Sequence, residues 1–290
     1  MPSHRATRRD YFSPGDRVGD YAIGEECSDE ETSTVYGAIH VLLPRKVTLK
    51  VLHAGEAQRE LAIQMLRAAC LLEALAHPAI PRVYECGVLP DRRPWTAIER
   101  IEGTSLATAF TQGPIAIADL VVILRDVADL LSHAHARGVV HRRLNADAIV
   151  RTPYRPLSVC VRHWDDALTT DTGANVELDA RDDVHALGVI AFRALTGCWP
   201  SPVVQAADWC PHAPLELTAL IDSMLASNAA ARPSSDEVRE RARWLADTVQ
   251  QLTIDRPRWT PPHGLEPEKL PKDDEDAGFT IRIAGSSSRS

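Results

Sequence analysis

The sequence lacks any run of about 18 apolar residues, the length that a membrane-spanning helix needs. Its most apolar window, Val184 to Leu195, is interrupted by His185 and Arg193. Its N-terminus is basic but has no apolar segment behind it, so it does not match a secretory signal. We therefore expect a cytoplasmic protein that does not associate with membranes.

Cysteine is scarce, with 6 residues in a chain of 290. No two of them form a Cys-x-x-Cys pair, and they do not cluster with histidine at zinc spacings. So few cysteines in so long a chain argue against a disulfide framework and against a metal site. The pattern predicts buried free thiols at Cys27, Cys70, Cys86, Cys160, Cys198 and Cys210.

An excess of positive charge is also absent. The chain has 32 Lys and Arg against 40 Asp and Glu, which gives a net charge of −8, and aromatic residues make up only 5%. This balance argues against nucleic acid or an anionic membrane as a partner. What is present, 44% apolar and 25% charged residues, is ordinary for a globular protein with a core.

The first third of the chain shows strand patterns around one helix. Strands are predicted from β-branched residues and partial alternation at Val35–Ile39, Lys46–Leu52, Arg82–Val88 and Trp95–Glu99. Apolar spacing predicts a helix from Glu56 to Ala76, which His77-Pro78 ends. From about residue 104 the chain is mainly helical, by the same periodicity. Its main helices are predicted at Ile117–Arg137, Asp183–Thr196, Leu215–Ala226 and Ser235–Leu252, with Ser234 or Ser235 as a cap.

Several short motifs occur in one order, and together they resemble those of bacterial Ser/Thr protein kinases over about residues 14–250. The clearest is His141-Arg142-Arg143-Leu144, which resembles the start of the catalytic-loop pattern H-R-D-L-x-x-x-N. The others are Val47–Lys50 (V-A-I-K), His77–Ile80 (H-P-N-I), Ile98–Gly103 (hinge), His135–Arg142 (approach to the catalytic loop), Asp179–Gly188 (D-x-Y-x-L-G) and Ala231–Pro233 (R-P).

The resemblance implies an α+β, two-lobed protein-kinase-like fold. Residues 14–102 would form a small β-rich N-lobe with one helix, and residues 103–254 a larger helical C-lobe. An N-terminal arm (1–13) precedes them. A tail (255–290) follows them, and its prolines, acidic run and serines predict disorder. The activation segment is shortened, because only 20 positions separate His163 from Asp183 and no A-P-E motif occurs there.

The residues that brace the large lobe match the family, whereas those that react do not. The bracing matches are His141, Arg142, Asp183 and Arg232, and the resemblance implies that Asp183 accepts hydrogen bonds from the catalytic-loop backbone. Arg143 replaces the catalytic Asp and cannot act as a base, because it stays protonated. Asn145 replaces an assisting Lys, and Ala148 replaces a metal-holding Asn.

The metal-binding D-F-G motif is also altered. His163 stands where its Asp belongs and cannot replace a hard carboxylate for Mg²⁺. A shift of two residues offers Asp165 and Asp166 instead. Our competing hypothesis is that these two acids pair with Arg143 in a salt-linked plug.

The phosphate loop lacks its glycines. Ser28, Glu30 and Ser33 stand at the three glycine positions, and residues 25–31 hold five carboxylates. Carboxylates repel phosphates, so this stretch predicts a solvated acidic turn or an acidic docking loop for a basic partner.

Lys50 remains where the family's lysine contacts phosphates, but Ala68 stands where its helix Glu partner belongs. Lys50 is therefore predicted to be a structural residue paired with the acidic loop. The alternative is a residual nucleotide contact shared with the hinge at Glu99 and Ile101.

From these losses we predict a catalytically inactive, bacterial-type pseudokinase that is not an enzyme. It would regulate or scaffold signalling by binding other proteins, such as an active Ser/Thr kinase or a phosphopeptide-binding module. No cofactor is expected, apart from ATP bound without magnesium. The alternative is a divergent ATP-dependent protein Ser/Thr kinase, or another phosphoryl or nucleotidyl transferase, that uses Lys50 with Asp165 or Asp166. Nucleotide sensing without catalysis is a third hypothesis.

Overall fold

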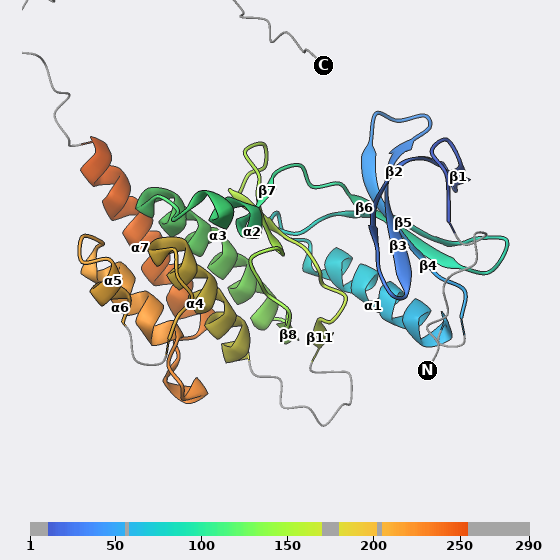
Figure 1. Cartoon of the computed structure of the whole chain (residues 1–290). Coiled ribbons are helices and arrows are strands. Elements are labelled where there is room, and N and C mark those ends of the chain that lie inside the picture. The colour runs from blue at the N-terminus through green and yellow to red at the C-terminus, as the bar shows by residue number, and fades with distance from the viewer. Residues whose placement is uncertain (1–10, 56–57, 170–179, 202–204, 255–290) are drawn as a thin grey trace, which may run out of the picture. The chain divides into compact units, whose positions relative to one another are not determined.

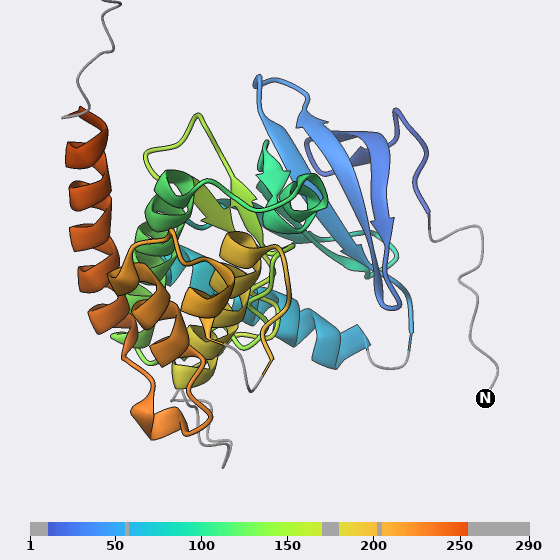
Figure 2. The ribbon, with the colours of Figure 1, turned by 60° about the vertical axis from the view of Figure 1, so that its left-hand side comes forward.

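The computed structural model describes residues 11–55, 58–169, 180–201 and 205–254 (Figure 1). Most of the predicted N-terminal arm, the centre of the shortened activation segment and the predicted tail lie outside the described residues. Within the described part, a β-rich lobe precedes a helical lobe, as Figure 2 shows from a second direction. The predicted two-lobed α+β fold is confirmed.

A six-stranded antiparallel sheet forms the N-lobe, with strand order β1-β2-β3-β4-β6-β5. Its strands are β1 (Arg17–Val18), β2 (Tyr21–Asp29), β3 (Ser33–His40), β4 (Lys46–Leu52), β5 (Val83–Val88) and β6 (Pro94–Glu99). Alternate residues of the central strands point inward, so Tyr36 and Leu49 are fully buried. These side chains make a separate small core under the sheet.

One long helix, α1 (Gln58–Leu75), packs on this sheet. Its buried residues are Met65, Ala69, Leu72 and Leu75, a spacing of three and four that places them on one helical face. The helix begins and ends within two residues of the predicted bounds, because that apolar stripe is a local pattern.

The acidic stretch differs from the prediction of a solvated turn. Strand β2 continues through it to Asp29, so the turn before β3 is only residues 30–32. Its pairing with β3 has register shifts between Ile23 and Ser28. Backbone hydrogen bonds require no apolar side chains, and the exposed carboxylates stay solvated while the strand pairs.

The C-lobe is built around α3 (Ile117–His135), which is buried along most of its length. The other helices are α2 (Leu106–Ala109), α4 (Ala180–Thr196), α5 (Ala206–Trp209), α6 (Leu215–Met224) and α7 (Ser235–Ile254). Helix α4 packs closely on α6 at Gly188. A Cβ at this position would lie 2.8 Å from Cβ of Met224, so the absence of a side chain permits the close approach. Helix α7 begins with a capping box, in which Ser234 Oγ accepts from Glu237 N and the Glu237 carboxylate accepts from Ser234 N.

Short strand pairs frame the loops that match the kinase motifs. Strands β9 (Ile149–Arg151) and β10 (Val159–Val161) pair with each other, and β9 also pairs with β7 (Thr104–Ser105). Strand β8 (Val139–Val140) pairs with β11 (Leu168–Thr169). The segments 141–148 and 162–167 thus leave paired strands at both ends, which holds them side by side.

The cysteines depart from the prediction of six buried thiols. Cys160 and Cys210 are buried, but Cys27, Cys70 and Cys86 are exposed, and all six are free. The exposed three lie at solvent-facing positions of β2, α1 and β5, and Cys198 is partly buried. Burial raises the pKa of the Cys160 thiol to about 12, so this group is unreactive. Within the described ranges, no helix is long and apolar enough to cross a bilayer.

Candidate functional site

The catalytic-loop backbone is held by Asp183, at the start of α4. This carboxylate is 1% exposed and accepts from His141 N at 2.8 Å and Arg142 N at 2.9 Å. Nε2 of His135, at the end of α3, lies 3.0 Å from the same carboxylate. Arg142 has a left-handed backbone (φ +66°), which turns both N–H groups toward one acceptor.

His141 joins this loop to the segment that follows β10. Its ring is fully buried, and burial lowers the pKa of the imidazole, so it is neutral. Nδ1 accepts from Arg143 N at 3.3 Å, which leaves Nε2 to donate to the Arg162 carbonyl at 3.0 Å. The ring also packs edge-on against Trp164, with centroids 4.5 Å apart. Trp164 stands at the Phe position of the altered D-F-G motif.

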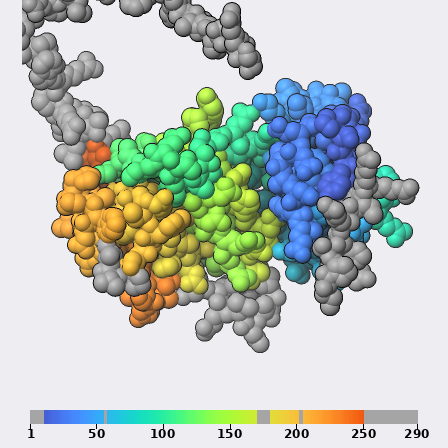
Figure 3. Space-filling model, viewed as in Figure 1, coloured from blue at the N-terminus to red at the C-terminus, as the bar shows by residue number. Residues whose placement is uncertain are grey.

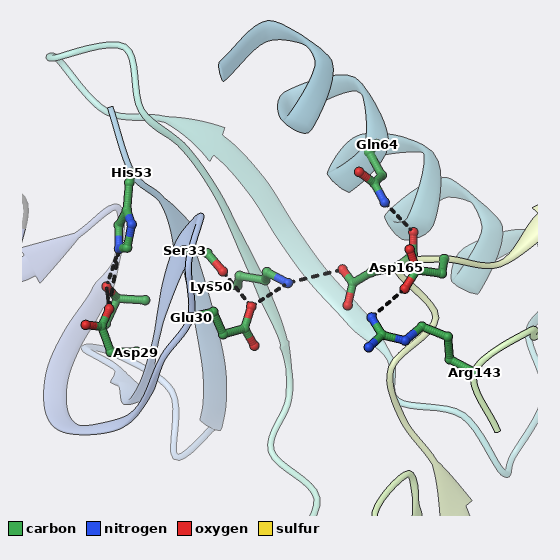
Figure 4. A network of polar contacts seen from close by, with 10 residues as sticks. Asp29, Glu30, Ser33, Lys50, His53, Gln64, Arg143 and Asp165 are labelled. Atoms are coloured by element: carbon green, nitrogen blue, oxygen red, sulfur yellow. Dashed lines mark hydrogen bonds and ion pairs between the residues drawn. The ribbon is translucent and has the colours of Figure 1, made fainter. Parts of the chain in front are cut away.

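Arg143 lies at the rim of the cleft. Its Nη1 donates to Oδ2 of Asp166 at 2.7 Å, and its side chain is 70% exposed. The plug hypothesis is therefore correct for Asp166 and wrong for Asp165, because Asp165 turns the other way, toward Lys50 (Figure 4). Asp165 and Asp166 lie in a turn between β10 and β11, and this turn directs Asp166 to Arg143 and Asp165 to Lys50.

Lys50 on β4 stands between two carboxylates. Its Nζ lies 3.2 Å from Oε2 of Glu30 and 3.4 Å from Oδ1 of Asp165 (Figure 4). Burial disfavours the charged ammonium, but Asp165 and Glu30 outweigh this effect and raise the pKa of Lys50. Burial likewise opposes ionisation of Glu30, yet the hydrogen bond from Ser33 and the charge of Lys50 leave the pKa of Glu30 below its usual value. The pair is ionised at neutral pH.

Helix α1 contributes no charge to Lys50 at its predicted position. Ala68 lines the neighbouring cavity with a methyl group. One turn earlier on the helix, Nε2 of Gln64 donates to the backbone carbonyl of Asp165 at 3.1 Å. Sequence reasoning missed this contact, since a single Gln on a helix gives no signal of a partner 101 positions away.

The cleft holds two adjoining cavities where the β-rich lobe (blue in Figure 3) meets the helical lobe. The inner cavity, about 470 Å³, is mostly apolar and is lined by Val35, Leu72, Ile98 and the hinge residue Ile101. The outer one, about 580 Å³, is lined by acids from both lobes: Glu30, Asp147 and Asp165 line both cavities, and Glu31 and Asp166 line the outer one in addition. Both volumes lie in the range of small-molecule sites, and Lys50 lines both cavities.

The other hinge residue, Glu99, has its carboxylate occupied. One oxygen accepts from Arg82 N at 3.1 Å, and the other accepts from Nη1 of Arg155, in the loop between β9 and β10. Nη2 of Arg155 also donates to the carbonyls of Pro78 at 2.8 Å and Ile80 at 3.0 Å. Arg155 thus ties the large lobe to the end of β6 and to the loop after α1. The side chain of Glu99 is a structural anchor, and the nucleotide contact at the hinge residues Glu99 and Ile101 stays a prediction.

Arg155→Ala is expected to lower the free energy of unfolding by about 2–3 kcal/mol, because it leaves a charged acceptor and two carbonyls without their donor. Arg155→Lys should recover only part of the loss, since a single ammonium cannot reproduce the guanidinium fork. Urea denaturation followed by circular dichroism measures both variants. Equal stability of Arg155→Ala and the unchanged protein would show that the anchor is dispensable.

The altered residues of the catalytic loop and of the D-F-G segment are held by other contacts. Oδ1 of Asn145 accepts from the backbone N of Asp147 and of Ala148, both at 2.9 Å. His163 is half-exposed, with Nε2 3.4 Å from a carboxylate oxygen of Asp147. Over the described ranges, no three His, Cys, Asp or Glu side chains are placed to hold a metal ion. Arg232 lies away from the cleft, where its Nη1 donates to Asp182 at 3.0 Å.

Comparison with known proteins gives one family match. Residues 32–195 match the family model described as protein tyrosine and serine/threonine kinase. Serine/threonine-protein kinase Pkn1 of Myxococcus xanthus is 30% identical over 210 residues, which are 64% of this chain and 30% of that protein. Serine/threonine-protein kinase PknB of Mycolicibacterium smegmatis is 28% identical over 280 residues, which are 80% of this chain and 45% of that protein. This chain therefore spans less than half the length of either relative.

Solved structures show the same fold. The kinase domain of Mycobacterium tuberculosis PknI superposes with a TM-score of 0.64 at 22% sequence identity. The match covers 83% of this chain and all of that domain. At this identity the similarity concerns the fold alone.

These comparisons contradict the prediction that the chain is not an enzyme. The relatives are named serine/threonine-protein kinases, and the matching family is one of enzymes. The family also implies the use of ATP, usually with magnesium, so the expectation of ATP without magnesium has no support. The prediction gave the altered positions more weight than the retained Lys50, which the structure pairs with Glu30 of the acidic loop, as predicted, and with Asp165.

Proposed function

This chain belongs to the protein tyrosine and serine/threonine kinase family, and on that premise we propose that it is a divergent ATP-dependent protein Ser/Thr kinase that uses Lys50 with Asp165. The observation that supports this proposal most directly is the place of Lys50. Its ammonium stands where the apolar cavity meets the acidic one, within 3.4 Å of a carboxylate of the altered D-F-G segment.

The cavities fit a nucleotide better than they fit a preformed metal site. The apolar walls at Val35, Leu72 and Ile98 suit a base and sugar, and the Lys50 ammonium suits a phosphate. Asp165 offers the oxygen ligands that magnesium prefers, but its carboxylate is held by Lys50 rather than grouped with other acids. We therefore assign no step to a metal. ATP supplies the phosphoryl group when bound.

The chain's own residues then act by position and charge. Lys50 binds phosphate oxygens at the inner end of the acidic cavity. Asp166, which Arg143 holds at the rim, orients the acceptor hydroxyl from the side of the catalytic loop. Such a site needs no strong base, because phosphoryl transfer passes through a loose transition state that is stabilised mainly by positioning and electrostatics.

The partner that this activity implies is a protein substrate with an accessible serine or threonine. The partners predicted from the sequence, an active Ser/Thr kinase and a phosphopeptide-binding module, would fit the same pathway as substrate and as reader of the product. We also propose the cytoplasmic location that the sequence predicts.

Lys50→Met is expected to reduce phosphoryl transfer by at least about 100-fold, because it removes the cation that contacts the phosphates. The matched control is Lys46→Met, four residues earlier on β4, where the ammonium pairs with Glu102 and is 63% exposed. Labelled ATP is incubated with the protein and a mixed Ser/Thr peptide library, with Mg²⁺ or Mn²⁺ present, and the transferred label is counted. The control should keep the activity of the unchanged chain.

Two results of this assay would contradict the proposal. Absence of transfer by the unchanged chain with either metal, in protein that thermal melting shows to be folded, would refute the proposed activity. Equal losses in the two lysine variants would refute the role of Lys50.

A further inference from the structure

The carboxylate of Glu30 occupies the side of Lys50 that faces the β2–β3 turn. Its Oε2 lies 3.2 Å from the ammonium and accepts from Ser33 Oγ at 2.7 Å (Figure 4). By sequence position, Glu30 stands in the loop that cradles phosphates in kinases. An anion of this chain is therefore already bound where the proposed function requires an anion of the nucleotide.

The charge around Lys50 disfavours the binding of a third anion. One ammonium already faces two carboxylates, and a phosphate beside them would meet two like charges within a few ångströms. At surface dielectrics a like-charge contact at about 4 Å costs on the order of 1–4 kcal/mol. At least one of the two carboxylates must leave Lys50 before a phosphate can bind there.

Asp165 is the less mobile of the two. It follows the buried Trp164, and its backbone carbonyl accepts from Gln64 on α1 at 3.1 Å. Glu30 begins a three-residue turn whose residues 30–32 are all exposed. Both side chains are 42% exposed, so the difference lies in the backbone: Glu30 can rotate into solvent from an exposed turn while the strands stay paired.

The turn is anchored on both sides of Glu30. Before it, Asp29 accepts from Thr34 Oγ1 at 3.2 Å and lies 3.6 Å from Nε2 of His53. After it, His53 N donates to the Thr32 carbonyl at 2.9 Å. Because of these anchors, the rotation of Glu30 requires only that its side chain moves and that its hydrogen bond from the Ser33 hydroxyl breaks. We call this hydrogen bond the latch.

We propose that Glu30 is autoinhibitory. In the empty protein its carboxylate occupies the position of a nucleotide phosphate on Lys50, and it must rotate away before nucleotide binds. This inference rests on the proposed function, because it concerns the same lysine. Nucleotide affinity would then depend on the position of Glu30 in the β2–β3 turn. Any cation that draws Glu30 away, including a basic segment of a substrate protein, opens the site.

The test compares charge-removing variants by nucleotide affinity. Glu30→Gln should tighten ATP binding by about tenfold, because it removes a half-exposed like charge and releases Lys50. The matched control is Glu31→Gln, which removes the same charge from the same turn; Glu31 makes no ion pair among the described residues. Ser33→Ala, which keeps the charge and removes the latch, should tighten binding by a smaller factor. Dissociation constants are measured by isothermal titration calorimetry with ATP, with and without Mg²⁺.

The outcomes separate this inference from the proposed function. Tighter binding by Glu30→Gln than by Glu31→Gln supports it, as does binding by Glu30→Gln when the unchanged chain binds too weakly to detect. Two outcomes overturn the inference and leave the proposed function standing, both with an unchanged chain that binds ATP. In the first, Glu30→Gln binds ATP no more tightly than the unchanged chain. In the second, Glu31→Gln gains as much ATP affinity as Glu30→Gln. Absence of binding by all variants, in protein that thermal melting shows to be folded, overturns both.

Discussion

Replacing Asp183 with alanine is expected to lower the free energy of unfolding by about 3–5 kcal/mol, among the largest effects of any single change in this chain. The carboxylate is 1% exposed and accepts the backbone N–H groups of His141 and Arg142. Alanine leaves both donors buried without an acceptor, together with the ring of His135, which also contacts the carboxylate. The catalytic loop would lose its link to α4.

The neighbouring residue provides the control. Asp182 pairs with Arg232 but is 73% exposed, so Asp182→Ala should cost about 0–1 kcal/mol. Guanidinium denaturation of both variants, followed by circular dichroism, measures the difference. A loss in Asp183→Ala no greater than that in Asp182→Ala would mean that the loop is held by other contacts.

Trp164→Ala is expected to cost about 3–5 kcal/mol through the cavity it leaves. The indole is 3% exposed, lies in the main hydrophobic core, and packs against His141. Its Nε1 also donates to the Val161 carbonyl at 3.0 Å. Trp164→Phe keeps the ring contact but loses this hydrogen bond, so its loss should be about 1–2 kcal/mol.

An exposed tryptophan is the matched control. Trp244 on α7 is 55% exposed, so Trp244→Ala should change stability by less than about 1 kcal/mol. The same denaturation experiment applies. Because Trp164 directly precedes Asp165, the alanine variant should also weaken ATP binding, whereas Trp244→Ala should not. Similar stability losses in the two alanine variants would show that Trp164 is not a core residue.

The fold was predictable because its signals are local. The stripe of Met65, Leu72 and Leu75 on α1 repeats at helical spacing, and the strand pattern of residues 46–52 is visible within one element. The kinase motifs are short and keep their order, so they indicate the family even at 30% identity. The acidic stretch was misjudged because a strand at the edge of a cleft carries charged side chains without apolar alternation.

The site was predictable only in part, because its contacts join distant positions. Lys50 and Asp165 are 115 residues apart, and the sequence offered Asp165 or Asp166 as the partner of Lys50 without deciding between them. Arg155 also joins distant positions, because its guanidinium reaches a carbonyl 77 residues away. The error about enzymatic function arose because the altered residues were given more weight than the ordered motifs that mark the family.

By itself, the sequence determined the two-lobed architecture, the family, the place of Lys50 and the identity of each altered residue, because all of these depend on local periodicity and motif order. Only the tertiary structure decided between the charge pairings that the sequence left open. It placed Arg143 on Asp166 rather than Asp165, turned Glu99 away to Arg155, and set Glu30 and Asp165 on the two sides of Lys50. The pairs of Glu99 with Arg155 and of Lys50 with Asp165 join the lobes, so they depend on the angle at which the two cores pack, which is a property of the whole chain. The other two pairs lie within one lobe and depend on how its loops fold.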